Sequence, residues 1–277
     1  FSTSASLHAA QRASRIYSNT SDEIINYSGV DGMINLMQGD CLERMKEIPD
    51  GSVDMILTDP PYGTTACKWD SIIPLEPMWE HLKRVIKPNG AIVMTASQPF
   101  TTTLISSNMK MFKYCWVWDK NQAVGFLNAW KQPLRKTEDV CVFYFKQCLY
   151  NPQIKDKEVK NIRNGRSIKT DALTDSYGKY KNDKSYRTLP HNKTMPVNLL
   201  SISRVNSSAG KIHPTQKPLA LMEYLIRTYT NEGETVLDFT MGSGTTGVAA
   251  KNLNRSFIGI ELDETYFNIA KDRINNS

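Results

Sequence analysis

The chain has 277 residues, of which 40% are hydrophobic and 22% are charged, with a formal net charge of +6. These values are ordinary for a soluble globular protein with one large domain, or with one domain that carries a substantial insertion. No apolar run approaches the roughly 18 residues that cross a bilayer, and five scattered cysteines without a CxxC pair and four isolated histidines argue against a disulfide framework and against a metal site.

Residues 1–22 are rich in Ser and Ala, and two arginines precede the first acid, Asp22. An organellar transit peptide has this composition, and so does an expression remnant or a misassigned gene start. We therefore expect residues 1–22 to be a disordered or processed tail, with the folded domain at 23–277. The cysteine content predicts a reducing, cytoplasmic compartment, and the tail leaves organellar targeting open.

Helical and apolar strand-like segments alternate in the first half of the domain. We predict strands at 33–38, 53–57 and 91–94, separated by helices at 41–48 and 75–86. This alternation indicates an α/β fold with a parallel sheet. The aromatic-rich segments 114–118 and 140–145 are strand candidates for an antiparallel edge.

A short motif, Thr58-Asp59-Pro60-Pro61-Tyr62-Gly63, follows the strand at 53–57. The prolines cannot continue a sheet ladder and hold the chain in a fixed bend, so Asp59 is expected at the carboxyl end of the strand and Tyr62 in an exposed turn. A carboxylate, proline carbonyls and an aromatic face suit the exocyclic amine of a flat base. Taken alone, the motif is better explained as a Pro-Pro turn with a capping Asp.

Residues 151–211 have weak periodicity and carry 13 Lys and Arg against 5 Asp and Glu, which leaves the rest of the chain slightly acidic. A basic segment on a near-neutral body suggests a polyanionic partner, and a solvated lysine-rich loop is the plain alternative. Sixty weakly patterned residues within a domain favour an inserted functional element.

Regular patterning returns with a predicted helix at 218–229 that begins at Pro218, a strand at 235–238, a helix at 245–253 and a strand at 257–261. A last helix is expected to begin at Asp263 as its N-cap.

The loop from Asp238 to Thr246 joins a strand to a helix through Gly242-Ser243-Gly244, and Glu261 ends the next strand. Glycines let backbone approach a ligand, and an acid at the end of the following strand binds ribose hydroxyls in folds of this kind. A cofactor that contains a nucleoside is therefore expected.

Four predicted strands end on acids, and this favours S-adenosylmethionine (SAM) over NAD or FAD. SAM has no pyrophosphate to be repelled, and the acids suit hydroxyls, an adenine amine, a sulfonium and a substrate amine. In an open α/β sheet, ligands bind outside the carboxyl ends of the strands. The four acids are Asp40, Asp59, Asp238 and Glu261.

The chain resembles the SAM-dependent amino DNA methyltransferases of the permuted β class, in which the catalytic motif precedes the cofactor motif. The resemblance runs from about Asn35 to Arg273 and rests on motifs in the β-class order. They are Gly39-Asp40, Asp-Pro-Pro-Tyr at 59–62, Lys-Pro-Asn-Gly at 87–90, Thr-Gln-Lys-Pro at 215–218 and Gly-Ser-Gly-Thr-Thr at 242–246. Two segments depart from the family: Asp-Phe-Thr at 238–240 stands where Asp-Pro-Phe is usual, and Thr-Glu at 137–138 where His-Glu is common.

The resemblance implies a Rossmann-like, doubly wound, seven-stranded mixed sheet, with residues 151–211 as an inserted target-recognition region. It implies catalysis by Asp59, Pro60, Pro61 and Tyr62, with Tyr62 stacked on a flipped base. SAM would be bound by Asp40, Lys217, Asp238, Phe239, Gly242, Ser243, Gly244, Thr245 and Glu261. Double-stranded DNA would contact Lys179, Lys181, Lys184 and Arg187.

An Asp in the first motif position favours the N6 of adenine, whereas Ser there favours the N4 of cytosine, which stays as the alternative. An RNA or protein amino-methyltransferase, and a non-catalytic nucleic-acid-binding relative, are weaker alternatives. The resemblance indicates a prokaryotic or phage protein associated with DNA, and it leaves open a homodimer and a cognate restriction enzyme.

Overall fold

A computed structural model describes residues 23–26, 32–65, 70–157, 189–190, 192–205 and 216–277. The chain divides into two compact units, one formed by Phe1–Asn151 with Asn198–Ser277, the other by Pro152–Val197. The predicted tail at 1–22 lies outside the described residues, as do the four predicted DNA contacts Lys179, Lys181, Lys184 and Arg187.

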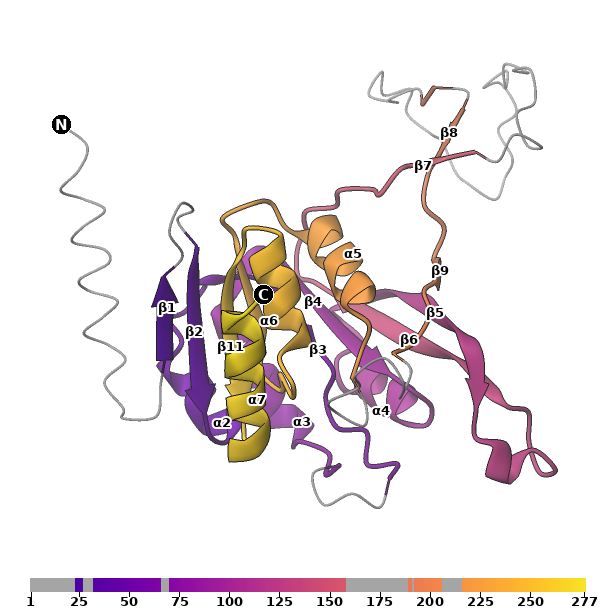
Figure 1. The fold of residues 1–277 in the computed structure, drawn as a ribbon, viewed down its shortest axis with the longest axis horizontal. Helices are drawn as coiled ribbons and strands as arrows, with labels where there is room; N and C mark the ends of the chain where they lie inside the picture. The colour runs from indigo at the N-terminus through magenta and orange to yellow at the C-terminus, as the bar shows by residue number, and fades with distance from the viewer. Residues whose placement is uncertain (1–22, 27–31, 66–69, 158–188, 191, 206–215) are drawn as a thin grey trace. The chain divides into compact units, whose positions relative to one another are not determined.

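The first unit is built on a mixed sheet, whose described part has nine strands in the order β1-β2-β11-β10-β3-β4-β6-β5-β9 (Figure 1). The five strands from β2 to β4 in this order pair in parallel, and β6 is antiparallel to both β4 and β5. The strands are β1 (Glu23–Asn26), β2 (Met33–Gln38), β3 (Val53–Thr58), β4 (Ile86–Ala96), β5 (Phe112–Val124), β6 (Arg135–Phe143), β9 (Leu199–Ser201), β10 (Thr235–Asp238) and β11 (Ser256–Glu261).

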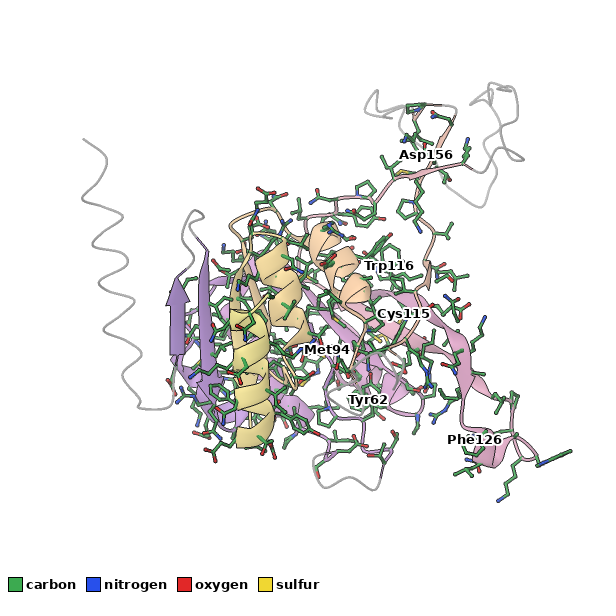
Figure 2. All side chains as sticks on the ribbon, in the orientation of Figure 1. Tyr62, Met94, Cys115, Trp116, Phe126 and Asp156 are labelled. Carbon is green, nitrogen blue, oxygen red and sulfur yellow. The ribbon has the colours of Figure 1, made fainter. Side chains whose placement is uncertain are left out.

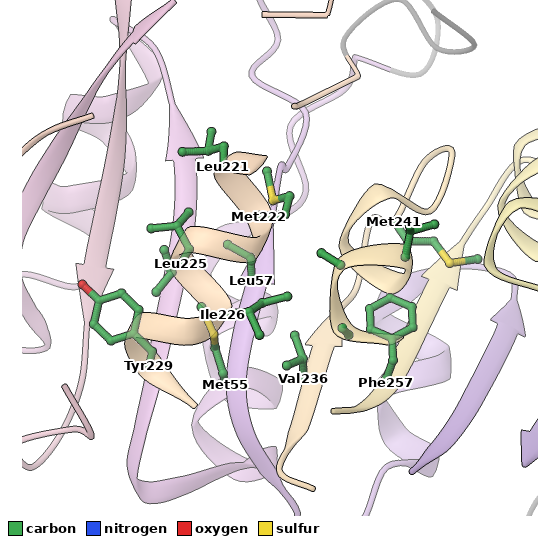
Figure 3. Close-up of a cluster of buried hydrophobic side chains, with 14 of the residues drawn as sticks. Met55, Leu57, Leu221, Met222, Leu225, Ile226, Tyr229, Val236, Met241 and Phe257 are labelled. Atoms are coloured by element: carbon green, nitrogen blue, oxygen red, sulfur yellow. The ribbon is translucent and has the colours of Figure 1, made fainter. Parts of the chain in front are cut away.

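Helices cover both faces of this sheet, so the doubly wound α/β prediction is confirmed. One apolar cluster joins α5, α6 and α7 to one face, and a second joins α2, α3 and α4 to the other. Figure 3 shows the first cluster, where side chains of α5 such as Leu225 and Ile226 face Met55 and Leu57 of β3. The helices are α2 (Cys41–Arg44), α3 (Leu75–Val85), α4 (Phe100–Ser107), α5 (Leu219–Tyr229), α6 (Thr245–Asn252) and α7 (Glu264–Asn275), with short 3-10 turns η1 (Met45–Glu47) and η2 (Phe126–Asn128).

The expected count of seven strands is exceeded by two short edge strands. The strand β1 pairs antiparallel with β2, and β9 pairs in parallel with β5. Both are only three or four residues long, which is too short for a periodic pattern to stand out in the sequence.

Strand β4 begins directly after α3, at Ile86, so the strand predicted at 91–94 starts five residues earlier than expected. Gly90 already lies within β4. A Cβ on Gly90 would stand 2.7 Å from the carbonyl oxygen of Asp54, at the neighbouring strand β3. This glycine therefore permits a close approach of two chain segments rather than a turn.

The second unit, in its described part, contains the short antiparallel pair β7 (Lys155–Asp156) and β8 (Lys193–Thr194), with an ion pair of 2.7 Å between Lys193 and Asp156. The unit is shorter than the predicted insertion at 151–211, because β9 belongs to the large sheet. Its role in target recognition stays a prediction. No helix in the described ranges is long and apolar enough to cross a membrane.

Candidate active site

A cavity of about 1010 Å³ opens at the carboxyl ends of the parallel strands of the first unit. The four acids predicted at strand ends all line it, because parallel strands end at the same edge of the sheet. They come from the segments after β2 and β3 and from the ends of β10 and β11, and they are Asp40, Asp59, Asp238 and Glu261. Pro60, Pro61 and Tyr62 also line the cavity.

Asp59 is the centre of a hydrogen-bonded cluster on one side of this cavity. Its Oδ1 accepts from the Tyr62 hydroxyl at 2.6 Å and from the Thr95 hydroxyl, and its Oδ2 accepts from Lys217 Nζ at 2.7 Å. The carboxylate is thus held in one orientation by donors from three separate segments of the chain.

Lys217 lies between two carboxylates and is almost completely buried. Its Nζ is 2.7 Å from Asp59 Oδ2 and 3.3 Å from Glu138 Oε2. Burial by itself would lower the pKa of Lys217, but the Asp59 and Glu138 carboxylates together raise it above its ordinary value. The ammonium is therefore charged. The second oxygen of Glu138 is 3.1 Å from Nζ of the buried Lys120.

Tyr62 does not project from an exposed turn, as the sequence suggested, but is half-buried within the first unit (Figure 2). Its ring stacks on Phe100 with centroids 5.3 Å apart, and Lys217 Nζ lies 5.5 Å from the ring centroid. Burial and the nearby Asp59 carboxylate raise the pKa of the Tyr62 hydroxyl well above its ordinary value, so the hydroxyl acts as a donor.

The segment after Tyr62 is held by Asp70, which the sequence reasoning did not single out. The carboxylate of Asp70 accepts backbone N–H groups from Tyr62, Gly63, Thr64 and Thr65 at 2.6–2.9 Å. Burial raises the pKa of Asp70, but a hydrogen bond from the Thr65 side chain, together with the backbone N–H groups, outweighs it and lowers the pKa below its ordinary value. A single Asp several residues downstream of the motif carries no recognisable signal in a sequence.

Asp238 lines the cavity, but its carboxylate is fully engaged by this chain. It accepts from the hydroxyls of Thr58 at 2.7 Å and Thr246 at 2.6 Å, and from the backbone N–H of Thr240 at 3.1 Å. Burial raises its pKa to about 6, and the hydrogen bonds only partly oppose that rise. Asp238 therefore ties the end of β10 to β3 and to the start of α6.

Glu261 holds the glycine loop from the next strand. Its two oxygens accept the backbone N–H groups of Gly242 at 2.8 Å and Asp263 at 2.9 Å, and burial raises its pKa. Gly242 has a φ of +52°, and a Cβ placed there would meet nothing within 4 Å. Bare backbone and an acidic side chain thus face open space together. Asp40, just after the neighbouring strand β2, caps α2 by accepting the N–H of Leu42 at 2.8 Å.

The other predicted cofactor residues divide by their surroundings. Phe239 is buried in the apolar cluster that includes α2, α3 and α4, and it also lines the cavity. Ser243 and Thr245 line the cavity, and Arg273 of α7 donates to the hydroxyls of both. Gly244, the N-cap of α6, is not among the lining residues, because its missing side chain would point into α7, 2.9 Å from the Ala270 Cβ.

The described residues contain no group of three or more His, Cys, Asp or Glu side chains that could hold a metal ion.

The family model described as DNA methylase matches residues 53–272, which include both the Asp59 cluster and the glycine loop. The chain belongs to this N6/N4 DNA methylase family. It is therefore a DNA methyltransferase, and the resemblance drawn from its motifs is confirmed.

Individual relatives agree with this family. The chain is 30% identical over 264 residues to the Type II methyltransferase M2.LlaDCHI of Lactococcus lactis subsp. cremoris, covering 87% of this chain and 88% of the relative. It is 27% identical to the Type II methyltransferase M.HpaI of Haemophilus parainfluenzae, covering 87% and 74%. The solved M1.HpyAVI–SAM complex is 29% identical with a TM-score of 0.57, covering 87% of this chain and all of the other. The cofactor bound in that complex is the one predicted from the glycine loop.

Proposed function

We propose that this methyltransferase transfers a methyl group from SAM to the N6 of adenine at a specific site in double-stranded DNA. The observation that carries the proposal is the Asp59 carboxylate, held at the end of β3 and facing a cavity that the glycine loop also lines. A carboxylate in this place can accept a hydrogen bond from the exocyclic amine of a target base. The motif begins with Asp, which favours adenine N6, and cytosine N4 is the alternative.

The glycine-loop side of the cavity fits SAM. The open space over Gly242 leaves room for a ligand against bare backbone, and Glu261 has carboxylate oxygens suited to ribose hydroxyls. When bound, SAM supplies an electrophilic methyl group on a sulfonium. The cavity of about 1010 Å³ is at the upper end of the roughly 300–1,000 Å³ usual for small-molecule sites, which leaves space for a base beside the cofactor.

On the other side, Asp59 and the Pro60 carbonyl would accept the two hydrogens of the target amine. The lone pair of that amine is conjugated with the ring, so orientation by fixed acceptors is what makes the nitrogen nucleophilic. The N–C bond would form as the C–S bond breaks, the demethylated cofactor would leave as a neutral thioether, and the surplus amine proton would pass to solvent. This displacement needs no covalent enzyme intermediate. Tyr62, held by Asp59 and Phe100, would form one wall for a flipped base.

Two parts of the chain suit contact with the DNA backbone and grooves. The connection between β5 and β6 carries the exposed apolar side chains Phe126, Leu127 and Trp130, and no acid occurs from 121 to 137 (Figure 2). Val124 and Arg135, at the base of this connection, line the cavity. The basic segment within 151–211, with Lys179, Lys181, Lys184 and Arg187, stays the predicted target-recognition region. A homodimer and a cognate restriction enzyme also stay predictions.

Incubation with tritiated SAM and separate DNA, RNA and protein substrates tests the proposal, followed by digestion of labelled DNA to nucleosides. We expect label in DNA and in N6-methyldeoxyadenosine. Label in N4-methyldeoxycytidine would show that cytosine N4 is the methylated position and not adenine N6. Label in RNA or protein alone would refute DNA as the substrate.

A further inference from the structure

Every oxygen of the Asp59 carboxylate that could receive a substrate amine already accepts a hydrogen bond from the protein. Tyr62 and Thr95 donate to Oδ1, and Lys217 donates to Oδ2. Tyr62 and Thr95 also bond to each other at 3.0 Å, so they form a closed group. Lys217 is therefore the donor whose displacement disturbs the fewest contacts.

Glu138 offers Lys217 a second acceptor within reach. Its Oε2 is buried and, among the described residues, accepts no hydrogen bond, although it lies only 3.3 Å from Lys217 Nζ. This oxygen is thus ion-paired with Lys217 without a well-directed hydrogen bond, and a buried acceptor gains stability when such a bond forms. The other oxygen, Oε1, is held by Lys120, which fixes the position of Glu138.

We propose that Lys217 is a positioning residue that passes its hydrogen bond from Asp59 Oδ2 to Glu138 Oε2 when the target amine enters. Before substrate binds, the lysine keeps the carboxylate paired and oriented. As the amine arrives, the ammonium moves to Glu138 and leaves Oδ2 free to accept an amine hydrogen. The inference rests on the proposed function, since it assigns Asp59 to the amine.

This exchange requires little movement and no change of charge. The distances of 2.7 Å and 3.3 Å show that Lys217 Nζ is already near both oxygens. The carboxylates facing the lysine keep it protonated, and in the observed arrangement its place near the Tyr62 ring is favourable for a cation. Glu138 is thereby assigned a role that its sequence context, Thr-Glu rather than His-Glu, left undefined.

Glu138→Ala tests the exchange, because it leaves Lys217 with Asp59 as its remaining carboxylate. We expect the single-turnover rate of methyl transfer to fall about 10-fold to 100-fold, while SAM affinity measured by calorimetry stays within a factor of about two. Glu138→Gln keeps an acceptor oxygen and should recover part of the rate. The matched control is Glu43→Ala, which removes an exposed glutamate paired with Lys46 outside the cavity and should leave the rate unchanged.

The decisive variant adds Lys217→Met to Glu138→Ala. With no lysine on Asp59 the exchange is unnecessary, so the double variant should be faster than Glu138→Ala alone. If Glu138 served only to support the fold, the second change would not restore the rate. A double variant that is as slow as the single variant, or a Glu138→Ala enzyme with the wild-type rate, overturns the proposal.

A crystal structure of the protein with duplex DNA and sinefungin, a SAM analogue that cannot donate methyl, gives a readout independent of activity. We expect Lys217 to be hydrogen-bonded to Glu138 and the target amine to be hydrogen-bonded to Asp59. Lys217 still bonded to Asp59 with the amine in place overturns the exchange. A wild-type protein that methylates no DNA would instead refute the proposed function, so the two failures are distinguishable.

Discussion

Asp59→Ala should separate the catalytic role of this carboxylate from its role in the fold. The change removes the acceptor of Tyr62, Thr95 and Lys217 together, and it leaves Lys217 near Glu138 alone. Methyl transfer should fall about 100-fold to 1,000-fold, the range found when one preorganised transition-state contact is deleted. SAM binding should persist, because the glycine loop and Glu261 are untouched.

The stability of the variant can be estimated from the buried pair. Removing one partner of a buried ion pair costs about 3–5 kcal/mol. Glu138 still neutralises Lys217 and the Asp59 side chain is 22% exposed, so we expect a loss below this range, about 2–3 kcal/mol. For a chain of this length that corresponds to a fall in Tm of about 5–10 °C.

The double variant Asp59→Ala/Lys217→Met distinguishes the two effects. Removing the Lys217 ammonium, which has lost Asp59 as its partner, should restore most of the lost Tm, as followed by circular dichroism. The initial rate of methylation should stay low. A fully active Asp59→Ala enzyme would refute the assignment of Asp59, and so would a double variant that regains activity along with stability.

Three further predictions follow from the glycine loop, a buried acid and the basic segment. Gly242→Asp should abolish SAM binding in calorimetry with near-native circular dichroism, because its side chain would enter open space next to Glu261; Gly244→Asp should instead lower Tm, because its side chain would meet Ala270 of α7. The folded-state pKa of about 6 for Asp238, against an ordinary 3.8, means that the stabilisation present below pH 3.8 is lost as pH rises through about 6; Asp238→Asn should therefore flatten the dependence of urea-unfolding stability on pH over about 4–6, where a wild-type slope in the variant would contradict the assignment. Neutralising Lys179, Lys181 and Lys184 together should weaken binding to all DNA sequences and reduce the salt dependence by up to about 0.9 log unit of slope per lost phosphate contact. An unchanged slope would indicate that the segment is only a solvated loop.

Much of the sheet and the loop was predictable because their signals are local. Apolar runs ending on acids identified β2, β3, β10 and β11, and parallel pairing alone then requires the acids to meet at one edge. The N-cap Asp263 was correct for the same reason, since its side chain accepts from Tyr266 three residues later.

The contacts of the catalytic cluster were not predictable, because they join residues far apart in the chain. Lys217 was expected to bind the cofactor, yet its ammonium donates a hydrogen bond to Asp59, which is 158 residues away in the sequence. Tyr62 was expected to be exposed because a Pro-Pro turn says nothing about Phe100, which covers its ring. The two loop glycines look alike in the sequence, and only the packing of α7 shows that they act differently.

Expression of the protein in a host whose DNA lacks amino methylation, followed by base-resolution sequencing for modified positions, tests the central claim most directly. The account predicts N6-methyladenine at one short recurring sequence, and no such mark from the Asp59→Ala variant. Modification at carbon 5 of cytosine, or an equal level of N6-methyladenine from the Asp59→Ala variant, would contradict it.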